Sequence, residues 1–177
     1  ARGHYCDAVL GRPAALLERL ATDHRQTTLQ LLDREMPHVR AVLATCAASL
    51  ESAAAVRALE VAVAMTEYWL GRHPAEGLDW LRRLQAAAPP LSTLRAQAAL
   101  SGAHLAYWLT DFVVGREMGE EARARFAAIG DALGEGRALR RLGAIAAATD
   151  DADEARVYLE ASLARLDEAG VEREIGT

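Results

Sequence analysis

The sequence predicts an all-α protein, built as a solenoid of stacked helical hairpins. Hydrophobic residues make up 51% of the 177 residues, much of that share is alanine, and aromatic residues account for only 5%. Alanine favours close-packed helices, whereas Val and Ile, which favour strands, are sparse. The helix–turn–helix layout of residues 94–130 recurs over residues 136–170. Because such a unit cannot bury its apolar faces alone, self-similar neighbours predict stacking.

Residues 1–51 are predicted to form an N-terminal helical cap. Residues 2–10 have a helical pattern, and Pro13 starts another helix, because the missing N–H of proline costs nothing in a first turn. A further helix is predicted from residue 24 to about residue 35. Pro37 interrupts this helix or restarts it as the helix that runs to residue 50.

Three helical hairpins are predicted to follow as one continuous domain over residues 52–177, with about nine helices and no strands in the whole chain. Their predicted bounds are 52–90, 91–131 and 132–170. In the first hairpin, Ser52 caps a helix that runs to Leu70, and Pro74 starts a second helix that ends near Ala87. The later helices are predicted over 92–109, 112–129, 136–148 and 152–169, with Asp150-Asp151 placed to cap the last.

The turns of the three hairpins align when Gly77, Gly115 and Ala155 are placed in register, which gives spacings of 38 and then 40 residues. In that register a small residue falls in the middle of each first helix, namely Ala64, Gly102 or Ala103, and Gly143. We expect these residues to let the second helix approach closely, although Gly costs roughly 1 kcal/mol against Ala in a helix. The alternative is two unrelated helical hairpins in an alanine-rich bundle.

Three segments carry a resemblance to a known family. Residues 68–81 read YWLGRHPAEGLDWL, residues 37–43 read PHVRAVL, and residues 136–163 have the Leu-Gly, Asp-Asp, Glu-Ala and Leu pattern of a complete tetratricopeptide hairpin. The sequence resembles the tetratricopeptide-like regions of large bacterial transcriptional regulators and signal-transduction ATPases. These include the LuxR-type and antibiotic-regulator types common in actinomycetes.

The resemblance implies a tetratricopeptide-like right-handed solenoid that acts as a non-catalytic interaction or sensor module of a larger cytoplasmic regulator. In the family a nucleotide-binding module precedes this region, but the sequence has no Lys and hence no glycine-rich phosphate loop ending in Lys-Ser or Lys-Thr. The chain begins at Ala1 rather than Met and ends at Thr177, so we expect a fragment of a longer protein.

The sequence also departs from the family pattern. The spacing exceeds the usual tetratricopeptide period of about 34 residues. Gly119 and Arg123 stand where the third hairpin carries Leu159 and Leu163, so the second helix of the middle hairpin is expected to pack less tightly.

The net charge, the apolar runs and the cysteine content of the chain argue against several classes of function. The net charge of −5 argues against nucleic-acid binding by this fragment, because phosphate contacts require a basic excess or stripe. No apolar run is long enough to cross a membrane and no signal peptide is present, so a cytoplasmic protein is expected. Cys6 and Cys46 are interpreted as ordinary buried thiols rather than a disulfide.

Catalytic and metal sites find little support. The five histidines show no pair at i, i+4 and no neighbouring pair of cysteines, so no metal site and no cofactor are predicted. The acidic clusters at 117–121 and 150–153 are interpreted as a solvated helix face and a helix N-terminus rather than an acid–base pair. We therefore expect no enzyme activity.

A partner-binding groove is predicted on the first helices of the hairpins, which line the concave side of tetratricopeptide-like stacks. Its expected residues are Thr66, Trp69, Gln97, Leu100, His104, Tyr107, Arg137 and Arg140. Such a surface suits a peptide or acidic helix, with aromatic anchors and arginines that pair with carboxylates. The alternative is that Trp69 and Trp108 pack in the core.

The expected partner is a protein, a peptide, another domain of the same parent chain, or a small effector. One alternative function is self-assembly, for example as a homodimer, through exposed ends of the solenoid. Another is a helical domain that binds a small ligand near Trp69, His104 and Tyr107.

Overall fold

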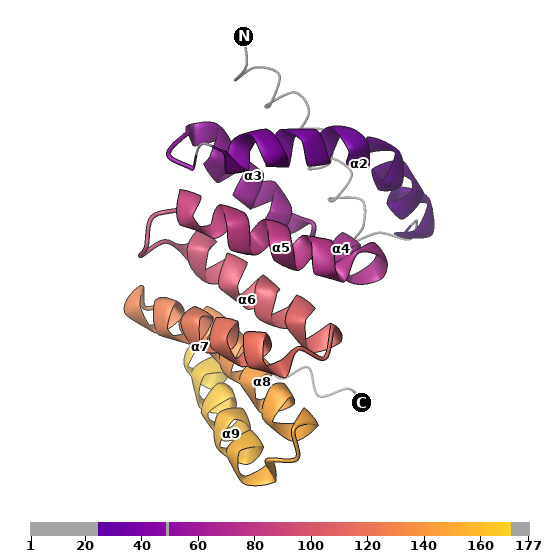
Figure 1. Cartoon of the computed structure of the whole chain (residues 1–177). Helices are drawn as coiled ribbons and strands as arrows, with labels where there is room; N and C mark the ends of the chain where they lie inside the picture. Colours follow the sequence, from indigo (N-terminus) through magenta and orange to yellow (C-terminus); the bar gives the residue numbers. More distant parts are fainter. Residues whose placement is uncertain (1–24, 49, 171–177) are drawn as a thin grey trace. The chain divides into compact units, whose positions relative to one another are not determined.

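The computed structural model describes residues 25–48 and 50–170, and these residues are mostly helical. They form eight α-helices and one short 3-10 helix, with no strand among them, so the all-α prediction is confirmed (Figure 1). The predicted helix over 2–10, the start at Pro13 and Cys6 lie outside the described residues. The chain divides into two compact units, Ala1–Pro89 and Pro90–Thr177, which are called the N-terminal unit and the C-terminal unit below.

The described part of the N-terminal unit packs around two adjacent aromatic residues, Tyr68 and Trp69, both of which are fully buried. Their rings meet edge to face with centroids 5.4 Å apart. The helices of this unit are α2 (Arg25–Ala47), α3 (Ala53–Ala64), α4 (Thr66–Arg72), α5 (Pro74–Leu84) and the 3-10 helix η2 (Gln85–Ala87). The predicted N-cap Ser52 and the predicted helix start at Pro74 are both confirmed.

Pro37 neither interrupts nor restarts a helix, contrary to the prediction, because α2 continues through it. The side chains of Leu32, Met36, Val39 and Leu43 are buried at successive helical spacings on both sides of the proline. Pro37 itself is exposed. Tertiary packing of the apolar stripe therefore holds the helix together where an interior proline would otherwise break it.

The helix predicted from Ser52 to Leu70 is in fact two helices, because the chain breaks at Met65 between α3 and α4. The indole N–H of Trp69 donates to the carbonyl oxygen of Ala62 at 3.1 Å, and the hydroxyl of Thr66 donates to the carbonyl oxygen of Val63 at 2.6 Å. Side chains thus take up carbonyl groups at the break. Ala64 is exposed at the end of α3, so it does not provide the predicted close approach.

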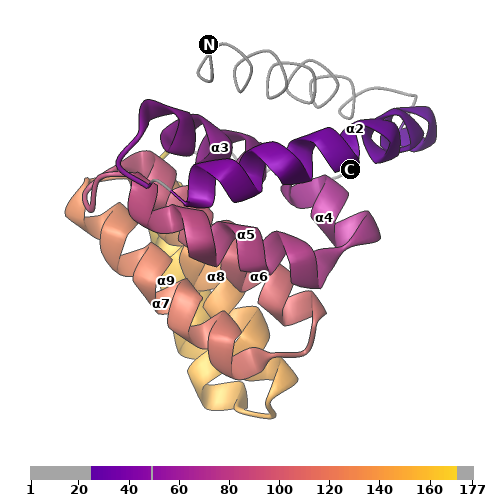
Figure 2. The same ribbon diagram turned by 45° about the horizontal axis from the view of Figure 1, so that its top comes forward.

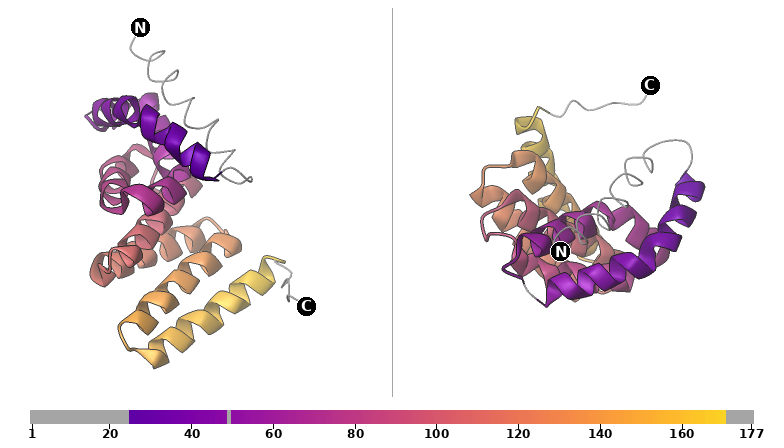
Figure 3. Two further views of the ribbon diagram at one scale, coloured as in Figure 1. Left: turned by 90° about the vertical axis from the view of Figure 1, so that its right-hand side faces the viewer. Right: turned by 90° about the horizontal axis from the view of Figure 1, so that it is seen from above.

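The described part of the C-terminal unit, residues 90–170, consists of four consecutive helices, each packed against the next. They are α6 (Thr93–Trp108), α7 (Phe112–Ala128), α8 (Ala132–Ala148) and α9 (Ala152–Glu168). Figures 2 and 3 show α7, α8 and α9, coloured from orange to yellow, side by side and alternating in direction. Helix α6 also contacts α8, which brings these two alternate helices together.

The links between these helices repeat the same design every 20 residues. Each link contains a residue in left-handed conformation, namely Thr110 (φ 57°), Gly130 (φ 72°) and Asp150 (φ 59°). The next residue in each case is an aspartate whose side chain caps the following helix, namely Asp111, Asp131 and Asp151. The cap at Asp131 explains why α8 begins at Ala132, four residues before its predicted start at Gly136.

Small residues set the distances between the helices of this unit. A Cβ atom on Gly143 would lie 2.8 Å from Cγ of Leu159, so the predicted close approach at Gly143 is confirmed. A Cβ on Gly119 would lie 2.8 Å from Cδ2 of Leu142, so α7 packs tightly on α8. The expectation of looser packing in the middle hairpin is therefore wrong, because its glycine admits a leucine from the next helix.

The packing of Trp69 against α5 yields a test of the N-terminal unit. A Cβ on Gly77 would lie 2.4 Å from Cγ of Trp69, a contact that real side chains do not tolerate. We expect Gly77→Ala to displace the indole and to lower the free energy of unfolding by about 1–3 kcal/mol. Urea denaturation measures this loss.

Gly71→Ala is the matched control, because no atom lies within 4 Å of the added Cβ in α4. It should leave stability unchanged or raise it by up to about 1 kcal/mol through helix propensity. Equal destabilisation by the two substitutions would contradict the packing argument.

Candidate interaction surface

Six of the eight predicted groove residues lie in the C-terminal unit, on α6 and α8. Thr66 and Trp69 belong to the N-terminal unit and are considered separately. The candidate site is called the α6–α8 surface, and it comprises Gln97, Leu100, His104, Tyr107, Trp108, Arg137, Arg140 and Arg141. Helical spacing places the first five along one stripe of α6 and the three arginines along one stripe of α8.

Trp69 lies in the core of the N-terminal unit, with 0% of its surface exposed. Its indole N–H is satisfied by the carbonyl oxygen of Ala62. Thr66 is partly buried and its hydroxyl bonds to the backbone of Val63. Trp69 is therefore a core residue. Neither Trp69 nor Thr66 presents a free polar group to a ligand in this structure.

Trp108 has the opposite placement, with 64% of its surface exposed, so the core interpretation of this residue is wrong. Trp108 is the last residue of α6, and its indole N–H donates to Nε2 of His104 at 3.1 Å, one helical turn earlier. A large exposed aromatic ring held by a hydrogen bond is a suitable anchor for a partner.

His104 is held in its neutral form. Burial lowers its pKa, the positive charges of Arg141 and Arg140 lower it further, and the result is a pKa of about 4 instead of the ordinary 6.5. Because Nε2 accepts the hydrogen bond from Trp108, the single proton of the neutral ring belongs on Nδ1. His104 can therefore donate one hydrogen bond to a ligand through Nδ1.

Arg141 links α8 to α6 through the ring of Tyr107. Its guanidinium carbon lies 5.1 Å from the ring centroid, within the range of a cation–π contact. Burial lowers the pKa of Arg141, and so does the neighbouring charge of Arg140. Tyr107 also meets Trp108, with ring centroids 6.2 Å apart, and Phe112, with centroids 6.0 Å apart. The aromatic cluster thus supports a half-buried cation.

The three arginines of the α6–α8 surface have no carboxylate partner among the residues that the structure describes. Elsewhere in the same residues, arginines commonly pair with carboxylates, as Arg40 does with Glu76 at 2.7 Å and Arg116 with Glu154 at 2.6 Å. No such ion pair within 4.0 Å is formed by Arg137, Arg140 or Arg141. The surface is therefore a local excess of positive charge on a chain of net charge −5.

The predicted groove includes Arg137 and Arg140 but neither Arg141 nor Trp108. The spacing of the three arginines, i, i+3 and i+4, was a signal for one helix face. For Trp108, its position as the last residue before the turn was the available signal.

The other features considered from the sequence are the metal site, the cysteines, the acidic turn and a membrane span. Over residues 25–48 and 50–170, no group of three or more His, Cys, Asp or Glu side chains is arranged to hold a metal ion. Cys46 is buried in α2. Asp151 caps α9, as predicted. None of the helices within these ranges is both long enough and apolar enough to cross a membrane.

Comparison with known proteins adds no relative: no protein-family model, curated protein or solved structure matches the chain.

The neutral state of His104 gives a testable pH dependence. We expect an NMR titration of its ring to show a midpoint near pH 4, and we expect the double variant Arg140→Gln with Arg141→Gln to raise that midpoint toward 6.5, because two repelling charges are removed. A midpoint near 6.5 in the unmodified protein would contradict the described environment.

The same shift has a consequence for stability. The pKa of His104 is lower in the folded state than in the unfolded state. Between about pH 6.5 and about pH 4 the unfolded state therefore binds more protons at this residue. The contribution of His104 to stability is therefore complete above pH 6.5 and declines as the pH falls toward 4. Urea denaturation of His104→Gln should lack this part of the decline.

Proposed function

We propose that the chain is a non-catalytic binding module whose α6–α8 surface captures a carboxylate-bearing segment of a partner protein. The observation that carries the proposal is the group of three arginines without carboxylate partners, placed beside an exposed tryptophan and a half-buried tyrosine. A bound segment that brings its own carboxylates would neutralise these charges.

The chemistry of each side chain defines the ligand. Guanidinium groups bind carboxylates through paired hydrogen bonds, and this suits Arg137 and Arg140, which are both exposed. Trp108 offers apolar area at low entropic cost, and His104 offers one neutral N–H donor. We infer that the preferred segment carries two carboxylates next to an aromatic or large aliphatic residue.

The setting of the module is proposed from the sequence. The motifs at 37–43, 68–81 and 136–163 resemble tetratricopeptide-like regions of bacterial transcriptional regulators and signal-transduction ATPases. We propose a right-handed tetratricopeptide-like solenoid in a larger cytoplasmic regulator of that kind. The 40-residue recurrence of the two hairpins in the C-terminal unit supports this arrangement. The captured segment then belongs to a partner protein or to another domain of the same polypeptide.

Charge reversal tests the proposal. Peptides are first selected from a random display library for binding to the unmodified chain. We expect the double variant Arg137→Glu with Arg140→Glu to bind these peptides at least about tenfold more weakly, which corresponds to about 1.4 kcal/mol. Fluorescence anisotropy measures the affinity, and far-UV circular dichroism should show unchanged helicity. The selected peptides should be enriched in Asp and Glu.

The charge-matched control is Arg34→Glu with Arg82→Glu, since both residues are exposed on helices of the N-terminal unit. This variant changes the net charge equally and should retain the peptides. Equal losses in the two variants would indicate a general charge effect, and unaltered binding in the first would rule out the α6–α8 surface.

A further inference from the structure

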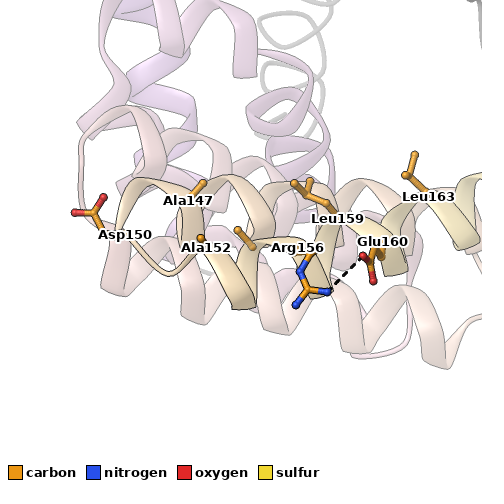
Figure 4. A pocket seen from close by; sticks show the side chains of 8 residues that line it. Ala147, Asp150, Ala152, Arg156, Leu159, Glu160 and Leu163 are labelled. Carbon is orange, nitrogen blue, oxygen red and sulfur yellow. Dashed lines mark ion pairs between the residues drawn. The ribbon is translucent and has the colours of Figure 1, made fainter.

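Helix α9 carries an apolar stripe that packs on α8 along one side and is exposed along the other. Leu159 and Leu163 are 41% and 46% exposed, which is high for leucine on a packed helix. Together with the turn at the end of α8, the stripe forms an open hollow of about 480 Å³ (Figure 4). Its lining residues are Ala147, Asp150, Ala152, Ala155, Arg156, Leu159, Glu160 and Leu163.

The equivalent face of α7 shows that this stripe is built as an interface. Positions 40 residues earlier are Gly115, Arg116, Gly119 and Glu120, and all four contact the next hairpin. A Cβ on Gly115 would lie 3.1 Å from Cδ1 of Ile145, and a Cβ on Gly119 would meet Leu142. Arg116 pairs with Glu154 at 2.6 Å, and Glu120 accepts a hydrogen bond from Tyr158 at 2.6 Å.

The side chains of the stripe are small at one end of α9 and large at the other, so two copies of the stripe can fit together when they run in opposite directions. Ala152 lies at its N-terminal end and Leu163 at its C-terminal end, with Arg156 and Leu159 between them. Two such stripes that run antiparallel, centred between residues 157 and 158, place Leu163 of each copy against Ala152 of the other. The leucine at the end of each stripe then faces a small residue, as Leu142 faces Gly119 where α8 packs on α7, and Leu159 of each copy lies against the aliphatic stem of Arg156 of the other.

The charges on the stripe fit the same alignment. Arg156 and Glu160 lie one turn apart and have opposite signs. Within one copy they form only a loose pair, 3.8 Å apart and mostly exposed. In the antiparallel alignment Arg156 of each copy comes beside Glu160 of the other, which gives two equivalent ion pairs about one axis.

We propose that two copies of this chain form a homodimer by antiparallel pairing of their α9 stripes about a two-fold axis. The dimer buries Leu159 and Leu163 of both copies. It uses none of the residues of the α6–α8 surface, so it is independent of the proposed partner binding. A single helix pair makes a small interface, and we expect a dissociation constant of roughly 10⁻⁶ to 10⁻³ M.

Sedimentation velocity across a concentration series tests the proposal on the whole chain. We expect a monomer–dimer equilibrium in which Leu163→Glu weakens association by at least about tenfold. Val157→Glu is the matched control, because Val157 is 59% exposed on the same helix but lies outside the stripe. A monomer at every concentration overturns the proposal, as does equal weakening by the two variants.

A charge exchange tests the alignment itself and does not depend on removing an apolar residue. Arg156→Glu alone should weaken the dimer, because it opposes Glu160 of the second copy. The double variant Arg156→Glu with Glu160→Arg should restore association with itself. Mixed with the unmodified chain, it should form at least about tenfold less heterodimer than either homodimer. Free mixing of the two chains overturns the antiparallel pairing.

Discussion

The C-terminal unit depends on one recurring constraint: an aspartate that caps each new helix directly after a residue in left-handed conformation. Asp111, Asp131 and Asp151 occur 20 residues apart, and each is followed by a helix of 17 residues. Because link and helix together have a constant length, residues 40 apart occupy equivalent positions on alternate helices. This constancy aligns the arginines of α8 with the aromatic stripe of α6, and it makes the exposed face of α9 the counterpart of the covered face of α7.

Features that depend on local chemistry could be predicted from the sequence. The all-helical class followed from composition and spacing, and the caps at Ser52 and Asp151 followed from side chains that compete for backbone N–H groups. Pro74 at a helix start and Gly143 at a helix contact were equally local signals. Arg137 and Arg140 could be assigned to the same surface as residues of α6, because helices and links of constant length place residues 40 apart at equivalent positions.

Features that depend on tertiary contacts could not be predicted. The helix through Pro37 persists because residues on both sides of it are buried, and a local pattern does not show that this packing outweighs the cost of an interior proline. The break at Met65 coincides with an indole that reaches back seven residues to Ala62, a bond that no spacing rule anticipates. Trp108 does not pack in the core, the alternative that the sequence left open, because its place at the last turn of α6 leaves it exposed.

Ion pairs are distributed unevenly over the described residues, and the arginines of the α6–α8 surface form none with a carboxylate. Between α7 and α9, Arg116 pairs with Glu154 and Tyr158 donates to Glu120, so charged groups there are partnered within the chain. The three arginines of α8 repel one another, and none of them pairs with a carboxylate of the described residues, although the chain carries 25 acidic residues. Like charges at this spacing destabilise a helix. Proteins depart from such local rules chiefly at functional sites, which supports the proposal that a ligand supplies carboxylates to these arginines.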